Sequence, residues 1–148
     1  MIPYISFLQK ARILIVDLLS DEIRSDELGE NLSQLKVVLK SGIIIYIRYN
    51  EYGEYGYQIK YSPEKNDFSR FDNFDDRWDV STQPHHFLKG NAEVIASPMS
   101  GDPHHDIPIL VKFIKEGTIN RRGGFKVFSY FFNTLWSPFT NKLQAYSK

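Results

Sequence analysis

Apolar residues near the start of the chain recur at three- and four-residue steps, a spacing typical of an amphipathic helix. Over residues 4–24 this stripe contains Ile5, Leu8, Ala11, Ile15, Leu18, Leu19 and Ile23. Polar residues of the same segment fall mostly off the stripe. The pattern therefore predicts a helix over 4–24, followed by an acidic, polar stretch that Gly29 ends.

From residue 34 onward the pattern changes to short runs rich in β-branched and aromatic residues, separated by turn residues. The strands that it predicts span residues 34–39, 43–49, 55–61, 68–72, 85–88 and 93–96. Because the connecting segments are short, we expect successive strands to pair antiparallel as a meander.

A loop rich in Pro, Gly and Asp covers residues 97–106, and a second helical pattern follows it. Proline fits only the first turn of a helix, so Pro108 predicts a helix with Asp106 as its N-cap rather than one that begins at Pro103. Its apolar face contains Ile107, Leu110, Val111 and Ile114, and Gly117 ends it.

The predicted fold class is α+β: an antiparallel meander of five to six strands, with an N-terminal helix and a C-terminal helix packed on it. Residues 1–117 are expected to form one domain. Residues 118–148 are an aromatic-rich extension whose spacing fits a helix and a strand equally. This extension packs on the same domain or serves as an interface, and both alternatives stay open.

Composition narrows the function classes. The chain has 148 residues, no cysteine and a formal net charge of zero. Without cysteine it has no disulfide and no thiolate chemistry. With a net charge of zero it lacks the overall positive charge that is typical of nucleic-acid-binding proteins. The N-terminus lacks a basic segment before an apolar run, and no apolar stretch reaches the roughly 18 residues of a membrane span. We expect a cytoplasmic protein without a membrane partner.

All four histidines lie in two Pro-His-His tripeptides, as His85-His86 and His104-His105. Neighbouring residues of an extended segment point to opposite faces, so the first pair does not easily chelate one metal ion. One of its members is a candidate acid or base, or a packed imidazole in a polar loop. The second pair is expected just before a helix N-terminus, which favours a nearby anion. The spacing matches no dedicated metal signature, so we assign no metal and no cofactor.

Three other clusters have functional and structural interpretations. Arg70 and Asp72 share one face of a predicted strand, where they could grip a phosphate and orient a base, or form a surface ion pair. Asp75, Asp76 and Asp79 could hold magnesium or form a solvated loop. Alternating tyrosines could form a stacking platform for RNA bases or part of a core; they are Tyr46, Tyr49, Tyr55, Tyr57 and Tyr61.

The order of these elements resembles the TumE-type toxin family of prokaryotic toxin–antitoxin systems. A strand that ends in Arg-x-Asp-Asn (Arg70, Asp72, Asn73) is followed by a polar loop, by Pro84-His85-His86 and by Gly90 before a Val-Ile strand. The resemblance covers residues 30–117. Two positions after the pair, where that family usually has another histidine, this chain has Leu88.

The resemblance implies a growth-inhibiting toxin that a small, usually DNA-binding, antitoxin protein neutralises. By analogy with other small toxins, we expect a metal-independent endoribonuclease acting on RNA. His85, His86, Arg70 and Asp72 are its candidate catalytic residues, and a homodimer stays open. The candidate substrate-binding residues are Asn73, Arg77, His104 and His105. The alternatives are a non-catalytic protein-binding module and a His/Asp metal-dependent hydrolase.

Overall fold

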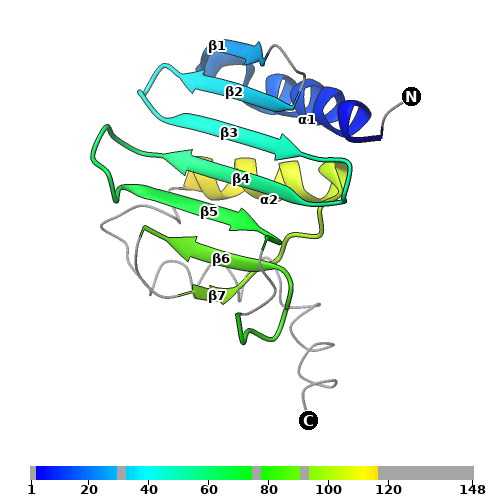
Figure 1. Cartoon of the computed structure of the whole chain (residues 1–148). Helices are drawn as coiled ribbons and strands as arrows, with labels where there is room; N and C mark the ends of the chain where they lie inside the picture. The colour runs from blue at the N-terminus through cyan, green and yellow to red at the C-terminus, as the bar shows by residue number, and fades with distance from the viewer. Residues whose placement is uncertain (1–2, 30–32, 75–77, 91–93, 117–148) are drawn as a thin grey trace. The chain divides into compact units, whose positions relative to one another are not determined.

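The computed structural model describes residues 3–29, 33–74, 78–90 and 94–116, and these residues contain a seven-stranded antiparallel sheet between two helices in sequence (Figure 1). The strands follow one another in the sheet in chain order, so the sheet is a meander. The α+β prediction is confirmed, with one strand more than expected. The helices are α1 (Pro3–Leu19), the short 3₁₀ helix η1 (Ser20–Glu22) and α2 (Pro103–Glu116). The strands are β1 (Ile23–Leu28), β2 (Gln34–Leu39), β3 (Ile44–Tyr49), β4 (Tyr55–Lys60), β5 (Phe68–Asp72), β6 (His86–Lys89) and β7 (Val94–Ala96).

The additional strand is β1, and the prediction of a helix up to residue 24 was wrong. The helix ends at Leu19, and Ile23 belongs to β1, which pairs with β2. β1 is an edge strand, and its exposed charged residues Arg24 and Glu27 hide the alternation that marks a strand. Arg12 of α1 donates from Nε to Asp26 Oδ1 of β1 at 2.7 Å, so the polar stretch is tied to the helix before it.

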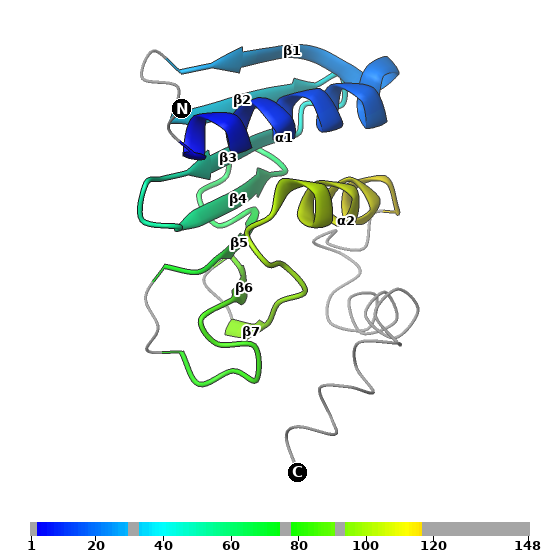
Figure 2. The ribbon, with the colours of Figure 1, turned by 90° about the vertical axis from the view of Figure 1, so that its right-hand side faces the viewer.

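The core lies between α1 and one face of the sheet (Figure 2). Leu8, Ala11, Ile15 and Leu19 of the predicted stripe are buried, which confirms the stripe. The sheet contributes a matching set of buried residues, one from every second position: Leu35, Val37, Leu39, Ile45, Ile47, Tyr49, Tyr57, Ile59, Phe71 and Phe87. The ring of Phe7 meets that of Tyr49 edge-on at 5.6 Å, so α1 covers this face as far as the end of β3.

The second helix begins at Pro103, not at Asp106. Its N-cap is Asp102, whose Oδ1 accepts from the backbone N of His104 and whose carbonyl accepts from that of Asp106. Pro103 fits the first helical position because the backbone N–H it lacks has no helical partner there. Pro108 lies inside the helix, where a proline costs roughly 3 kcal/mol, and the contacts of Asp106 described below fix the turn that precedes it.

The chain divides into two compact units, Met1–Pro108 and Ile109–Lys148, so only the first six residues of α2 belong to the unit that contains the sheet. The extension predicted over 118–148 and the helix end predicted at Gly117 lie outside the described residues. Within the described part of the chain, no helix is long and apolar enough to cross a membrane.

Candidate functional site

The face of the sheet opposite α1 brings together residues from five strands. The register places Gln34, Arg48, Gly56, Asp72 and His86 in one row across β2 to β6. A second row runs parallel to it and contains Lys36, Tyr46, Gln58, Arg70 and Leu88. We call these two rows the open face, because the helix contacts described for residues 3–108 fall on the other face, at Tyr49 and Tyr57.

The open face contains a hollow of about 370 Å³, within the lower part of the range of about 300–1,000 Å³ that is common for ligand pockets. Gly56 helps to form it, because it places no side chain between Arg48 and Asp72 in the first row. A Cβ atom at Gly56 would lie 3.4 Å from the ring of Phe74. The hollow is lined by Gln34, Tyr46, Arg48, Gly56, Gln58, Arg70, Asp72 and Phe74.

Positive charge gathers on this face although the whole chain is neutral. Lys36, Arg48 and Arg70 lie in the two rows, and Lys60 pairs with Phe68 in the next row on the same face. The acidic residues of these rows are Asp72 and, opposite Lys36 on β1, Glu27. Arg70 donates to Gln58 Oε1 at 3.4 Å, and its guanidinium lies 5.3 Å from the centre of the Phe68 ring. These contacts hold the Arg70 side chain against the sheet, where it lines the hollow.

Asp72 and His86 form a buried pair at one end of the first row. They are direct partners in β5 and β6, each about 5% exposed, and Asp72 Oδ1 lies 2.7 Å from His86 Nε2. His86 Nδ1 lies 3.0 Å from the carbonyl oxygen of Pro84, which can only accept. Both ring nitrogens of His86 therefore face oxygen atoms. Asp72 lines the hollow, whereas His86 is not among the lining residues.

His85 points to the opposite face, as the alternation of an extended segment predicts. Its Nδ1 lies 2.8 Å from the hydroxyl of Tyr55, and the two rings stack at 5.8 Å. Burial lowers the pKa of His85 and raises that of Tyr55 well above its ordinary value. The Tyr55 hydroxyl therefore stays protonated and donates a hydrogen bond to Nδ1 of a neutral His85. The two members of the first histidine pair do not act on the same group.

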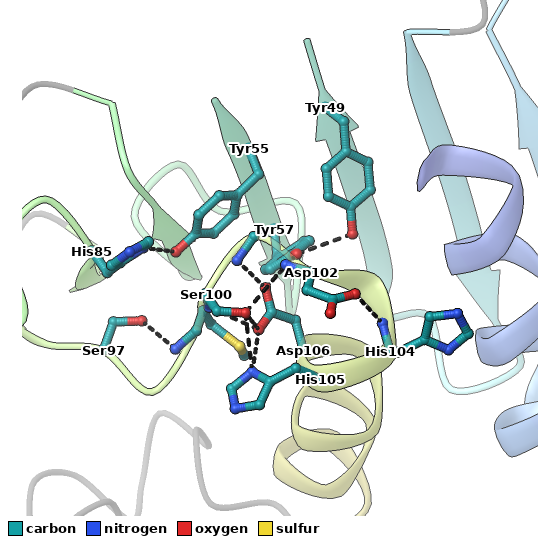
Figure 3. A network of polar contacts seen from close by, with 12 residues as sticks. Tyr49, Tyr55, Tyr57, His85, Ser97, Ser100, Asp102, His104, His105 and Asp106 are labelled. Atoms are coloured by element: carbon teal, nitrogen blue, oxygen red, sulfur yellow. Dashed lines mark hydrogen bonds and ion pairs between the residues drawn. The ribbon is translucent and has the colours of Figure 1, made fainter. Parts of the chain in front are cut away.

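A second polar network surrounds Asp106, which is fully buried in the first turn of α2 (Figure 3). Its Oδ2 accepts from the Tyr57 hydroxyl at 2.6 Å and from the backbone N of Gly101 at 2.7 Å. Its Oδ1 accepts from the backbone N of Ser100 at 2.8 Å and faces His105 Nδ1 at 2.7 Å. One carboxylate thus joins the sheet, the loop before α2 and the start of that helix.

Two tyrosines extend this network into the core. The Tyr57 hydroxyl uses its one hydrogen to donate a hydrogen bond to Asp106. The hydroxyl of Tyr49, 3.0 Å away, is therefore the donor in its hydrogen bond with Tyr57. Burial raises the pKa of both tyrosines, so both hydroxyls stay protonated and can donate.

The remaining predicted site residues have structural partners or lie elsewhere. His105 places Nδ1 near both Asp106 and the Ser100 hydroxyl, whereas a Ser-His-Asp relay needs them at different ring nitrogens. His104 is exposed at the start of α2. Asn73 accepts from the backbone N of Tyr55 and donates to the carbonyl of Gly53, which clamps the turn before β4. Arg77, with Asp75 and Asp76, lies outside the described residues.

Of the eight predicted site residues, the structure therefore brings three together on the open face: Arg70, Asp72 and His86. The prediction from sequence did not include Arg48, Gly56 and Gln58, because only the register across strands places them beside Arg70. Of the tyrosines considered as a platform, Tyr46 lies on the open face, while Tyr49, Tyr55 and Tyr57 are buried on the other. Among the described residues, no group of three or more His, Asp or Glu side chains could hold a metal ion.

Comparisons of the chain with models of protein families, with curated proteins and with solved structures find no match.

Proposed function

We propose that the chain is the toxin of a two-component toxin–antitoxin module and that it acts on RNA through the open face. The observation that carries the proposal is one hollow lined by two arginines, two aromatic residues and Asp72, which is paired with the buried His86 outside the lining. Cationic side chains bind phosphates, and exposed aromatic rings stack on unpaired bases. Single-stranded RNA offers both partners, and the resemblance to the TumE-type family points to the same class of target.

The reaction that fits the hollow is cleavage by the ribose 2′-hydroxyl of the RNA itself. Asp72, the acidic residue that lines the hollow, takes the proton of this hydroxyl. The 2′-oxygen then bonds to phosphorus, the bond from phosphorus to the 5′-oxygen breaks, and water in the open hollow protonates the leaving oxygen. Arg48 and Arg70 stabilise the negative charge that develops on the phosphate.

The sequence makes His86 and His85 the candidate base and acid, with Asp72 orienting a histidine or an arginine. The hollow favours Asp72 itself as the base. Both ring nitrogens of His86 already face oxygen atoms, at Asp72 and at Pro84. His86 is therefore a positioning residue that fixes the carboxylate, and His85 has no part in this hollow.

Induced expression in a host cell tests the proposal. Expression of the intact chain is expected to stop growth and to yield cleaved RNA, and the Arg48→Gln/Arg70→Gln variant is expected to do neither. Arg24→Gln/Lys40→Gln is the matched control, since it removes two exposed positive charges away from the open face. Unimpaired growth with the intact chain, or arrest that persists without Arg48 and Arg70, would contradict the proposal.

A further inference from the structure

We propose that the hollow binds one ribonucleotide, with its 3′-phosphate between Arg48 and Arg70 and its 2′-hydroxyl at Asp72. This inference rests on the proposed action on RNA and specifies the part of RNA that the hollow reads. It predicts a selectivity for ribose over deoxyribose that binding alone can reveal, without cleavage.

The two arginines are placed to hold one phosphate together. Arg48 is on β3 and Arg70 on β5, so they flank β4, two strand intervals and one row apart, which corresponds to about 12 Å between their Cα atoms. Gly56 places no side chain of its own beside Arg48, although the ring of Phe74 lies 3.4 Å from where a Cβ would be. Gln58 and Phe68 hold the guanidinium of Arg70. A guanidinium group commonly donates two parallel hydrogen bonds to phosphate oxygens. A phosphate bound over β4 could therefore accept hydrogen bonds from both arginines.

Asp72 explains why the ligand carries a hydroxyl next to that phosphate. A carboxylate repels phosphate oxygens and only accepts hydrogen bonds while it is ionised. Its place in the same hollow as Arg48 therefore calls for a ligand with a donor beside its phosphate. The 2′-hydroxyl of a ribonucleotide is directly next to the 3′-phosphate, and deoxyribonucleotides lack it. His86 holds the carboxylate in place from behind.

The size and lining of the hollow fit one nucleotide. Its volume of about 370 Å³ suits a single small ligand, and Tyr46 and Phe74 provide aromatic surface for a base. Stacking on aromatic rings accepts any base, so the inference specifies the sugar and the phosphate and not the base.

Titration of the intact chain by calorimetry tests the inference with three probes that differ at one atom. They are adenosine 3′-monophosphate, its 2′-deoxy form and its 2′-fluoro form, of which only the first can donate from the 2′ position. We expect the first probe to bind about tenfold more tightly than the others, the effect of one hydrogen bond to a charged group. Asp72→Leu is expected to remove this difference, and Gly56→Leu to weaken all three probes alike.

Equal affinity of the intact chain for the three probes would overturn the inference, as would tighter binding of an acidic peptide such as hexaglutamate. The comparison among probes needs no variant, so it stands even if Asp72→Leu does not fold. If the intact chain stops growth and cleaves RNA but binds the probes equally, this inference fails and the proposed function stands. Ribose-selective binding without growth arrest or cleavage supports the inference and contradicts the proposed function.

Discussion

Asp72 and His86 face each other across β5 and β6, with Asp72 Oδ1 2.7 Å from His86 Nε2, and both side chains are almost fully buried. Removing one partner of such a pair leaves a buried polar group without its partner and costs about 1–3 kcal/mol, or more where the group is charged. The pair therefore has a structural and a proposed chemical role, and an experiment must separate them.

His86→Ala is expected to restore growth when the chain is expressed without a neutralising partner, and to lower the free energy of unfolding by about 1–3 kcal/mol. The double variant Asp72→Asn/His86→Gln keeps a neutral hydrogen-bonded pair, so it is expected to regain most of that stability and still to permit growth. Urea unfolding and growth curves measure the two effects. Arrest that survives both His85→Ala and His86→Ala would show that the histidine pair has no role in toxicity.

The arginines of the hollow are expected to account for part of the salt dependence of RNA binding. Each phosphate contact contributes about one unit to the slope of log K against log salt concentration, slightly less for single strands. Arg48→Gln and Arg70→Gln are each expected to lower this slope by about 0.7 for a single-stranded oligonucleotide, measured by fluorescence anisotropy. Arg24→Gln serves as the control. A slope that changes as much in Arg24→Gln as in the other two would place the RNA away from the open face.

Burial of His85 makes stability depend on pH in the mildly acidic range. Its pKa in the folded state lies below the ordinary value of 6.5, so the unfolded chain binds more protons between these two values. Stability is therefore complete above about pH 6.5 and falls as the pH drops through the folded pKa of His85. Urea midpoints at pH 7.5 and 5.5 measure this loss, which His85→Gln is expected to reduce. An equal loss in the variant would assign the pH dependence to other groups.

How far the fold could be predicted depended on whether local pattern or tertiary pairing decides an element. The stripe of α1 and the alternation of β2 to β6 are local signals, and both were readable in the sequence. β1 was not, because its exposed charged residues on a sheet edge resemble a loop until the pairing with β2 is known. The start of α2 was misjudged because Pro108 breaks a local rule that the buried contacts of Asp106 override.

The candidate site, like the fold, has a part that local pattern predicts and a part that only tertiary pairing determines. Alternation along an extended segment correctly separates His85 from His86, and the two-residue spacing places Arg70 and Asp72 on one face. Arg48 and Gly56 lie 22 and 14 residues before Arg70 in the chain, and only the register of three strands brings them into the same hollow. No local spacing contains that information.

The Asp106 network predicts a large stability effect at a distance from the hollow. Tyr57→Phe removes one donor to a fully buried carboxylate, so it is expected to lower the free energy of unfolding by about 1.5–3 kcal/mol. Tyr52→Phe is the matched control, because Tyr52 is 80% exposed and its loss is expected to change stability by less than about 0.5 kcal/mol. Urea unfolding of both variants measures the difference. If they unfold alike, the contact between Tyr57 and Asp106 does not hold α2 to the sheet in solution, and the interior Pro108 needs another explanation.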